Sequence, residues 1–331
     1  MKAWRDKNKN AAAALLADMG GTYTRCAILN NGKIERVEVQ ANKSYDGPAA
    51  LLEAYLRQLP GEIRPRQAAL AIAAPVRGDE VQLTNLDWSF SIAKLRRQLR
   101  LDTLEAVNDF TAVALAVPHL GPAGVAQIGS GRALPDAAIG VLGPGTGLGV
   151  SGLLPCAGGW TPITGEGGHV TLAPASREES DILATLRERY GHVSAERVLS
   201  GPGLTALFAC LAGEEATAVH SPELLIKMAV TEHHPLARRT LDHFFAFLGT
   251  TAGNLALTLG ARGGIYLAGG ILPRLVDNLK ASAFRERFTG KGRFRDYLEA
   301  IPTLVVIEPH PALRGLAALL QPPPPDFQQG Q

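Results

Sequence analysis

Cysteine is scarce in this sequence. Only three of the 331 residues are cysteines, Cys26, Cys156 and Cys210, and they stand far apart. They form no CxxC pair and no Cys/His cluster, so the sequence predicts neither a disulfide framework nor a zinc site. Such sparse cysteine use is typical of a reducing compartment, and we expect a cytoplasmic protein.

An excess of charge of one sign is also missing. The chain has 33 Lys and Arg against 31 Asp and Glu, for a formal net charge of +2. A nucleic-acid-binding protein typically carries a cluster of basic residues on its surface, and a disordered acidic tail is a long run of Asp and Glu. We therefore expect no nucleic-acid partner.

Long apolar runs are nearly absent as well. Asp18 interrupts the apolar stretch "AAAALLADMGG" too early for a secretory signal. One uncharged run, Phe244–Ala261, approaches the length of a membrane span and contains a GxxxG spacing at Gly249 and Gly253. It stands alone and carries several Thr and Asn residues. We expect a buried central helix whose small residues allow close packing, and no membrane association.

The apolar pattern that is present predicts a layered α/β protein. A chain of 331 residues suggests two domains. Strand-like and helix-like segments alternate, and a strand–turn–strand pattern followed by helices occurs twice. Predicted strands are Leu15–Asp18, Arg25–Leu29, Ile34–Gln40, Ala68–Val76, Ala138–Leu142 and Val150–Leu154; predicted helices are Gly47–Leu59, Ser91–Arg100 and Thr111–Val117, with a mostly helical region from Glu178 to about Gly260. The proline-rich C-terminal "PPPPDFQQGQ" is not expected to join a packed core.

Two glycine-rich turns interrupt this pattern. The first follows Asp18 in "LLADMGGTYTR", and the second is "GVLGPGTGLGVSGLL". A glycine turn can be a tight hairpin, or it can bring backbone N–H groups close to a phosphate. A carboxylate such as Asp18 would repel phosphate unless a Mg²⁺ ion, held through water, lay between them. The second turn has more glycines than one hairpin needs.

Neither turn matches a common nucleotide motif. No GxxxxGK[ST] sequence occurs, and the GxGxxG pattern fails because Val150 stands where its third glycine would be. Nucleotide binding would therefore depend on two hairpins, one from each half of the chain. That is the arrangement of the actin–hexokinase superfamily.

Six motifs in order narrow the resemblance. They are "ADMGGTYTRCAIL", "NDFTAVALAVP", "GPGTGLGVSGLL", "GEGGHVTLAP", "SAERVLSGPGL" and "GGIYLAGGILPRL". Over about residues 14–320 the chain resembles the bacterial glucokinase family. The resemblance implies a two-domain α/β, actin-like/hexokinase-type ATPase fold with an inter-domain cleft. Its small domain would comprise residues 1–119 plus about 310–331, its large domain residues 120–309, and it commonly forms a homodimer.

The same resemblance implies an ATP-dependent, Mg²⁺-dependent kinase that phosphorylates glucose at its 6-hydroxyl, at the entry to glycolysis. Asp109 resembles the catalytic base, and Asp18 would bind Mg²⁺ through water. Sugar-binding positions are Asn108, Asp109, Glu166, His169 and Glu196; nucleotide-binding positions are Asp18, Gly20, Gly21, Thr22, Gly143, Gly145, Thr146, Gly147, Gly269 and Gly270. One departure is Tyr23, where the family has Asn. The related repressor–kinase family has a cysteine-rich zinc motif after its histidine, but no such cysteines follow His169, so no zinc is expected.

The residues themselves leave other interpretations open. Asp109 at a strand-to-helix turn suits a general base, but Asn and Asp also cap helices. The two roles are compatible if Asn108 caps and Asp109 faces substrate. His169 could equally be structural, and Glu196 could be an ordinary helix residue. Trp88 could stack on a sugar, but hydrophobic packing is the simpler interpretation.

Three alternative functions remain at this point. The chain could phosphorylate another hexose or an amino sugar, because the motifs alone do not select glucose. It could be a non-catalytic sugar sensor of the same fold, although only about 14 residues precede the first strand, too few for a DNA-binding helix-turn-helix. It could be a polymerising actin-like scaffold, which would not need Glu166, His169 and Glu196.

Overall fold

A computed structural model describes residues 13–83, 86–213 and 221–320. The proline-rich C-terminal tail lies outside these residues. The chain divides into two compact units. Unit 1 takes in the described parts of Met1–Leu120 and Pro309–Gln331, together with Ala157–Trp160. Unit 2 takes in Gly121–Cys156 and the described part of Thr161–Glu308.

The sheet of unit 1 has five strands in the order β3-β2-β1-β4-β7. β1 pairs antiparallel with β2, which pairs antiparallel with β3, whereas β1, β4 and β7 run parallel. Because β1, β4 and β7 run the same way, their carboxyl ends share one edge of the sheet. The strands are β1 (Ala14–Met19), β2 (Tyr23–Asn30), β3 (Lys33–Ala41), β4 (Gln67–Ile72) and β7 (Thr103–Asn108).

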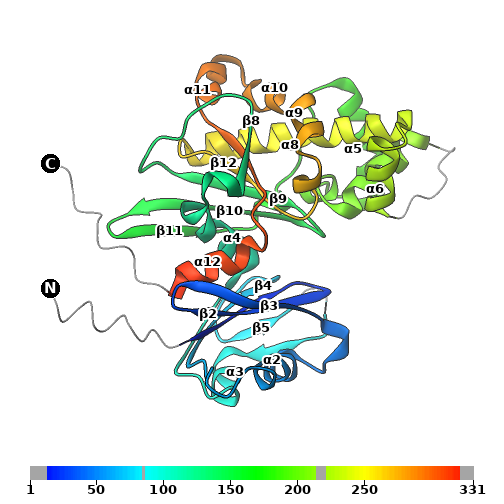
Figure 1. The fold of residues 1–331 in the computed structure, drawn as a ribbon. Helices are drawn as coiled ribbons and strands as arrows, with labels where there is room; N and C mark the ends of the chain where they lie inside the picture. Colours follow the sequence, from blue (N-terminus) through cyan, green and yellow to red (C-terminus); the bar gives the residue numbers. More distant parts are fainter. Residues whose placement is uncertain (1–12, 84–85, 214–220, 321–331) are drawn as a thin grey trace, which may run out of the picture. The chain divides into compact units, whose positions relative to one another are not determined.

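Helices cover this sheet on both faces (Figure 1). On one face α12 (Pro311–Leu320) packs against α4 (Asp109–Ala116), β4 and β1. On the other, α2 (Pro48–Arg57) and α3 (Ile92–Gln98) close a core with alternate residues of β1 and β2. A short two-stranded sheet joins β5 (Glu80–Gln82) to β6 (Ser89–Ser91). Trp88 is only 7% exposed in this core, so hydrophobic packing was the correct interpretation.

The sheet of unit 2 repeats the same plan with one strand added. Its order is β11-β10-β9-β12-β13-β8. β9 pairs antiparallel with β10 and parallel with β12, β12 is parallel to β13, and β8 is antiparallel to β13. The strands are β8 (Val125–Ile128), β9 (Ile139–Pro144), β10 (Leu148–Cys156), β11 (Gly159–Thr164), β12 (Ile265–Leu267) and β13 (Thr303–Val306). The predicted double use of a strand–turn–strand pattern in an α/β protein is confirmed.

The helices of unit 2 are mostly drawn from the region predicted to be helical. They are α5 (Arg177–Tyr190), α6 (Gly201–Ala212), α7 (Pro222–Val230), α8 (Pro235–Leu259), α9 (Val276–Ala281), α10 (Phe284–Thr289) and α11 (Arg295–Glu299). Short 3₁₀ helices are η2 (Asn42–Ser44), η3 (Val117–His119), η4 (Pro122–Gly124), η5 (Gly167–His169), η6 (Ala195–Arg197), η8 (Leu272–Arg274) and η9 (Gly292–Phe294).

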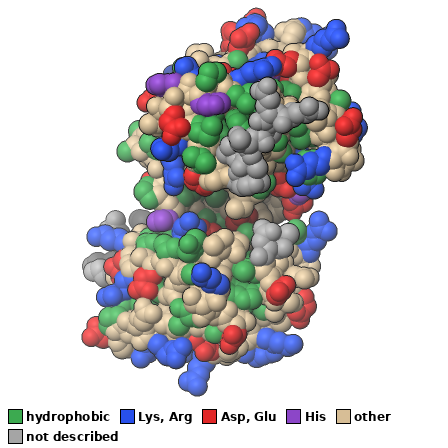
Figure 2. Space-filling model, turned by 90° about the vertical axis from the view of Figure 1, so that its right-hand side faces the viewer, with side chains coloured by type: hydrophobic (Ala, Val, Ile, Leu, Met, Phe, Trp, Pro, Cys, Tyr) green, Lys and Arg blue, Asp and Glu red, His purple; other side chains and the backbone are tan. Residues whose placement is uncertain are grey.

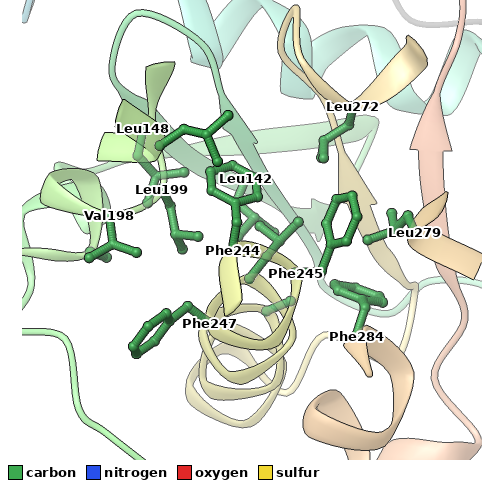
Figure 3. Close-up of a cluster of buried hydrophobic side chains, with 14 of the residues drawn as sticks. Leu142, Leu148, Val198, Leu199, Phe244, Phe245, Phe247, Leu272, Leu279 and Phe284 are labelled. Atoms are coloured by element: carbon green, nitrogen blue, oxygen red, sulfur yellow. The ribbon is translucent and has the colours of Figure 1, made fainter. Parts of the chain in front are cut away.

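Helix α8 is the buried central helix that its uncharged sequence predicted. Phe244, Phe245 and Phe247 are 0–1% exposed and lie among side chains from β9, α9 and α10 (Figure 3). A methyl group on Gly249 or Gly253 would overlap the backbone of α10, so the GxxxG spacing allows these two helices to pack closely. None of the described helices combines the length and apolar character needed to cross a membrane.

The surface shows no separation of charge on the face seen in Figure 2. Lys and Arg side chains are interspersed there with Asp and Glu side chains over both units. This mixing agrees with the nearly balanced composition of 33 basic and 31 acidic residues.

Candidate active site

The first glycine turn, Gly20–Thr22, connects β1 to β2 in unit 1. The Gly20 N–H donates to the Tyr23 carbonyl (3.1 Å), which closes the turn. Asn42, which is 1% exposed at the start of η2, holds the turn from the side. Its Nδ2 donates to the Gly20 carbonyl (2.8 Å), its N–H donates to the Thr22 carbonyl (3.0 Å), and its Oδ1 accepts from the Thr24 hydroxyl (2.8 Å). One buried amide therefore fixes both ends of the turn.

Asp18 lies one residue from the end of β1, directly opposite Arg25 of β2. The Arg25 guanidinium donates to Oδ2 of Asp18 (3.3 Å), and the Asp18 side chain is 15% exposed. Burial raises the pKa of Asp18, and the charge and hydrogen bond of Arg25 oppose that rise. The arrangement keeps a carboxylate next to the glycine turn, on the same sheet edge as the end of β7.

Asn108 and Asp109 lie where β7 passes into α4. Asn108 is the N-cap: its Oδ1 accepts from the N–H groups of Phe110 (3.0 Å) and Thr111 (3.3 Å). Its Nδ2 donates to Oδ1 of Asp109 (2.9 Å), which also accepts from the Phe110 N–H (2.9 Å). Within the described chain, Oδ2 of Asp109 accepts no hydrogen bond from another residue. One carboxylate oxygen is thus fixed by two hydrogen bonds, and the other is not.

The environment of Asp109 sets its acidity. Burial raises the pKa of the Asp109 carboxyl from its ordinary 3.8 to about 6, and repulsion by the Asp18 carboxylate adds to the rise. Hydrogen bonds from Phe110 and Asn108 act in the opposite direction. A carboxylate with a pKa just below neutral is mostly ionised at pH 7, yet it is basic enough to take a proton from a hydroxyl.

The second glycine turn, Gly145–Gly147, connects β9 to β10 in unit 2. Gly143 lies within β9, paired with Gly149, and the space beside it is filled by Ala268. Gly145 N–H donates to the Gly147 carbonyl (2.8 Å), and the Gly145 carbonyl accepts from the N–H of Gly201 at the start of α6 (2.8 Å). The face of Gly145 where a side chain would project is open.

Both turns keep amide groups available. Gly20 and Gly145 use their N–H groups to close the turns. In the part of the chain that the structure describes, the N–H groups of Gly21, Thr22, Thr146 and Gly147 have no hydrogen-bond partner. Unpaired N–H groups that follow one another in a turn form an anion-binding concavity, so each turn can accept a phosphate.

Glu196 is brought to the second turn from far along the sequence. Its Oε2 accepts from the Leu148 N–H (2.9 Å), across 48 residues. A methyl group on Gly147 would overlap the same oxygen, so a larger residue there would displace the carboxylate from its present position. Glu196 was predicted as a sugar-binding residue, but its contact with the turn was not foreseen.

The remaining predicted positions lie around this turn. Glu166 and His169 are exposed at the two ends of η5, where the His169 N–H donates to the Glu166 carbonyl (3.0 Å). The Ala195 N–H donates to the Val170 carbonyl (2.9 Å), which brings η6 and Glu196 beside η5. Gly269 follows β12 and lies against Pro144, and the face of Gly270 is open.

Each unit therefore contains some of the site residues predicted from the sequence. Asp18, the first turn, Asn108 and Asp109 share a sheet edge in unit 1, whereas the second turn, Glu166, His169, Glu196 and the Gly269–Gly270 pair belong to unit 2. Within the described residues, no group of three or more His, Cys, Asp or Glu side chains could hold a metal ion.

The fold and these features define the class of protein. Two units that share a five-strand plan, to which unit 2 adds β8 at one edge, and that each have a glycine turn on their first hairpin, constitute an actin-like/hexokinase-type kinase fold. The chain belongs to the glucokinase family, whose model matches residues 15–323.

Individual relatives agree with this assignment. The chain is 48% identical over 314 residues to the glucokinase of Paramagnetospirillum magneticum, covering 93% of this chain and 98% of that one. Among solved structures, the glucokinase of an Antarctic psychrotroph is 36% identical, with a TM-score of 0.83 over 93% of this chain and 98% of that one. The glucose complex of Balamuthia mandrillaris glucokinase, at 21% identity, has the same fold, with a TM-score of 0.77 over 96% of each chain.

Proposed function

We propose that this protein is an ATP-dependent glucokinase that converts glucose to glucose 6-phosphate at the entry to glycolysis. The observation that carries the proposal is the arrangement of Asp109, with one carboxylate oxygen fixed and the other unbonded, in a chain of the glucokinase family. Phosphoryl transfer needs a positioned nucleophile, neutralised phosphates and a group that accepts the nucleophile's proton.

Asp109 acts as the general base in this proposal. Its Oδ2 accepts the proton of the sugar 6-hydroxyl as the hydroxyl oxygen attacks the γ-phosphorus of ATP, and ADP leaves. Asn108 orients the base through the 2.9 Å bond to Oδ1. A positioned base of suitable pKa typically contributes about 10²–10⁴-fold to the rate.

The phosphates of ATP are proposed to bind the free N–H groups of the two glycine turns, Gly20–Thr22 and Gly143–Gly147, with the nucleoside beside Gly269 and Gly270. Asp18 offers one carboxylate, which fits Mg²⁺, because this ion is usually held by one or two carboxylates together with water and substrate phosphates. Mg²⁺ bound there would neutralise phosphate charge.

The sugar is proposed to bind Glu166, His169 and Glu196 in unit 2, and Asn108 and Asp109 in unit 1. Carboxylates accept hydrogen bonds from neighbouring sugar hydroxyls, and His169 can donate one. The exposure of Glu166 and His169 supports this assignment, because neither side chain is enclosed by protein. A site of this kind discriminates strongly against sugars that lack a hydroxyl.

We also propose a cytoplasmic homodimer without a zinc site. The family resemblance supports the dimer, and the three free cysteines, one of them exposed, support a reducing compartment. Light scattering on a size-exclusion column would measure the mass, and a mass of one chain at micromolar concentration would contradict the dimer.

The experiment that tests the function is a coupled assay of Mg²⁺-ATP turnover against a panel of hexoses and amino sugars. Wild type and Asp109→Ala should be measured side by side. We expect glucose to be the best substrate and the variant to lose at least about 10²-fold in kcat while still binding glucose. Turnover of another sugar in preference to glucose, or near-normal turnover by the variant, would contradict the proposal.

A further inference from the structure

Glu196 lies in contact with the turn proposed to bind phosphate. Its Oε2 accepts from the Leu148 N–H, the first residue after the turn, and fills the space beside Gly147. Within the described residues its Oε1 makes no hydrogen bond, and no side-chain oxygen there is both buried and unpartnered, so Oε1 is accessible. One carboxylate thus has one oxygen on the turn and one oxygen free.

The position of this carboxylate is tightly fixed. The Ser200 hydroxyl donates to the Glu196 carbonyl (2.8 Å), and Gly201 N–H donates to the Gly145 carbonyl (2.8 Å). Val198 and Leu199, which follow η6, are fully buried in the cluster that also holds Leu142 and Leu148 (Figure 3). The turn and the segment that carries Glu196 therefore share one core and cannot easily separate.

This contact places a negative charge where an anion is expected to bind. Within the described residues the N–H groups of Thr146 and Gly147 are unpaired, but the side chain that lies against Gly147 is an acid. A carboxylate repels phosphate, and the repulsion is strong at short range where water is partly excluded. Leu148 uses one of the carboxylate's lone pairs but does not remove its charge.

We propose that Glu196 couples sugar binding to nucleotide binding by controlling the charge beside the second glycine turn. The inference rests on the proposed function, in which a sugar hydroxyl donates to Oε1. That donation spreads and partly offsets the carboxylate charge, so the turn binds phosphate more tightly once sugar is present. By linkage, ATP then strengthens sugar binding by the same factor. Without sugar the charge disfavours ATP, which limits unproductive hydrolysis.

Glu196→Gln tests the charge directly. Glutamine keeps the shape and a carbonyl oxygen that can accept from the Leu148 N–H, but it has no charge. Affinity for Mg²⁺-AMP-PNP should be measured by calorimetry with and without saturating glucose. We expect glucose to raise the affinity of the wild type about tenfold. We expect the variant without glucose to bind about as tightly as the wild type with glucose, and to gain less than twofold from glucose.

Two further variants separate charge from other effects. Glu188→Gln removes the same charge from an exposed position on α5 of the same unit and should leave both affinities unchanged. Glu196→Asp keeps the charge but draws it back from the turn, so its nucleotide affinity in the absence of glucose should lie between those of the wild type and the glutamine variant. If the aspartate variant binds AMP-PNP more tightly than the glutamine variant does, charge is not responsible and the inference is overturned.

These experiments distinguish a failure of the inference from a failure of the proposed function. If wild type phosphorylates glucose but Glu196→Gln binds AMP-PNP no better than wild type without sugar, the inference fails and the function stands. If wild type phosphorylates no hexose, the proposed function fails. The comparison of the two proteins without sugar would then still decide whether Glu196 opposes nucleotide binding.

Discussion

Replacing Asp109, the proposed base, by asparagine should stabilise the protein while it abolishes activity. The folded state holds this carboxyl with its pKa raised from 3.8 to about 6. Because the pKa of this carboxyl is higher in the folded state than in the unfolded state, its ionisation destabilises the folded state. At about 1.4 kcal/mol for each pKa unit, the shift lowers the free energy of unfolding at pH 8 by at most about 3 kcal/mol.

The pH dependence of this stabilisation has a defined sign. Above pH 6 wild type carries the charge in both folded and unfolded states, so the asparagine variant gains the full difference. As pH falls from 6 towards 3.8, folded wild type takes up a proton while the unfolded chain is still ionised, and the difference shrinks. It should be about half as large at pH 5 and should disappear below about pH 4.

Thermal unfolding of both proteins at pH 8 and pH 5 measures this effect. The asparagine Oδ1 can accept the same two hydrogen bonds as Oδ1 of Asp109, so the substitution removes charge with little other change. Asp102→Asn is the matched control in the same unit. Asp102 is exposed and its pKa is lowered by Arg66, so its replacement should not stabilise at pH 8. An asparagine variant at position 109 that is no more stable than wild type at pH 8 would refute the reasoning.

Three other predictions follow from contacts described above. In wild type, kcat/KM for glucose should fall about tenfold for each pH unit below the Asp109 pKa of about 6, because the proposed base is then protonated, as a pH–rate profile would show. Asn42→Asp should raise KM for ATP about tenfold and leave KM for glucose nearly unchanged, because a carboxylate cannot donate a hydrogen bond to the Gly20 carbonyl in the first turn. Steady-state kinetics measures both constants, and Asn30→Asp, at the other end of β2, is the control. Arg287→Met should cost about 3–5 kcal/mol of unfolding free energy in urea titrations, because it leaves Glu179, which is 1% exposed, without its ion-pair partner.

Each of these predictions has an outcome that would contradict it. A pH profile that stays flat down to pH 5 would mean that another group accepts the proton. Equal changes in both KM values for Asn42→Asp would indicate general damage to unit 1 instead of a displaced turn. A double variant, Arg287→Met with Glu179→Leu, should recover most of the stability lost by the single change, and failure to recover it would show that the ion pair is not the cause.

The sequence predicted much of the fold because its signals are local. Apolar runs broken by glycine identified β1, β2, β9 and β10, and the uncharged run identified α8. The start of α4 was placed two residues late, at Thr111 instead of Asp109. Asn108 ends a strand and caps a helix at once, and only the hydrogen bonds to Phe110 and Thr111 show where one becomes the other.

The contacts that shape the turns could not be predicted because they join distant segments. Asn42 lies 22 residues from Gly20 and 18 from Thr24, in a stretch with no distinctive pattern. Glu196 meets Leu148 across 48 residues, and "AERV" contains nothing that marks it as a partner of a glycine turn. A residue's type and spacing indicate which chemistry it can perform, whereas its partner depends on how the two sheets and their connections pack.

The packing of α12 against α4 has a consequence for how the protein is made. Gly315 of α12 lies against the backbone of Ala112 in α4, the helix that begins with Asp109, the proposed base. Because α12 follows unit 2 in the sequence, the ribosome must make all of unit 2 before α4 gains this neighbour. At about 5–20 residues per second that interval is roughly 10–40 s. During synthesis this side of α4 is therefore uncovered for that interval, and the packing of unit 1 around α4 is completed only when α12 emerges.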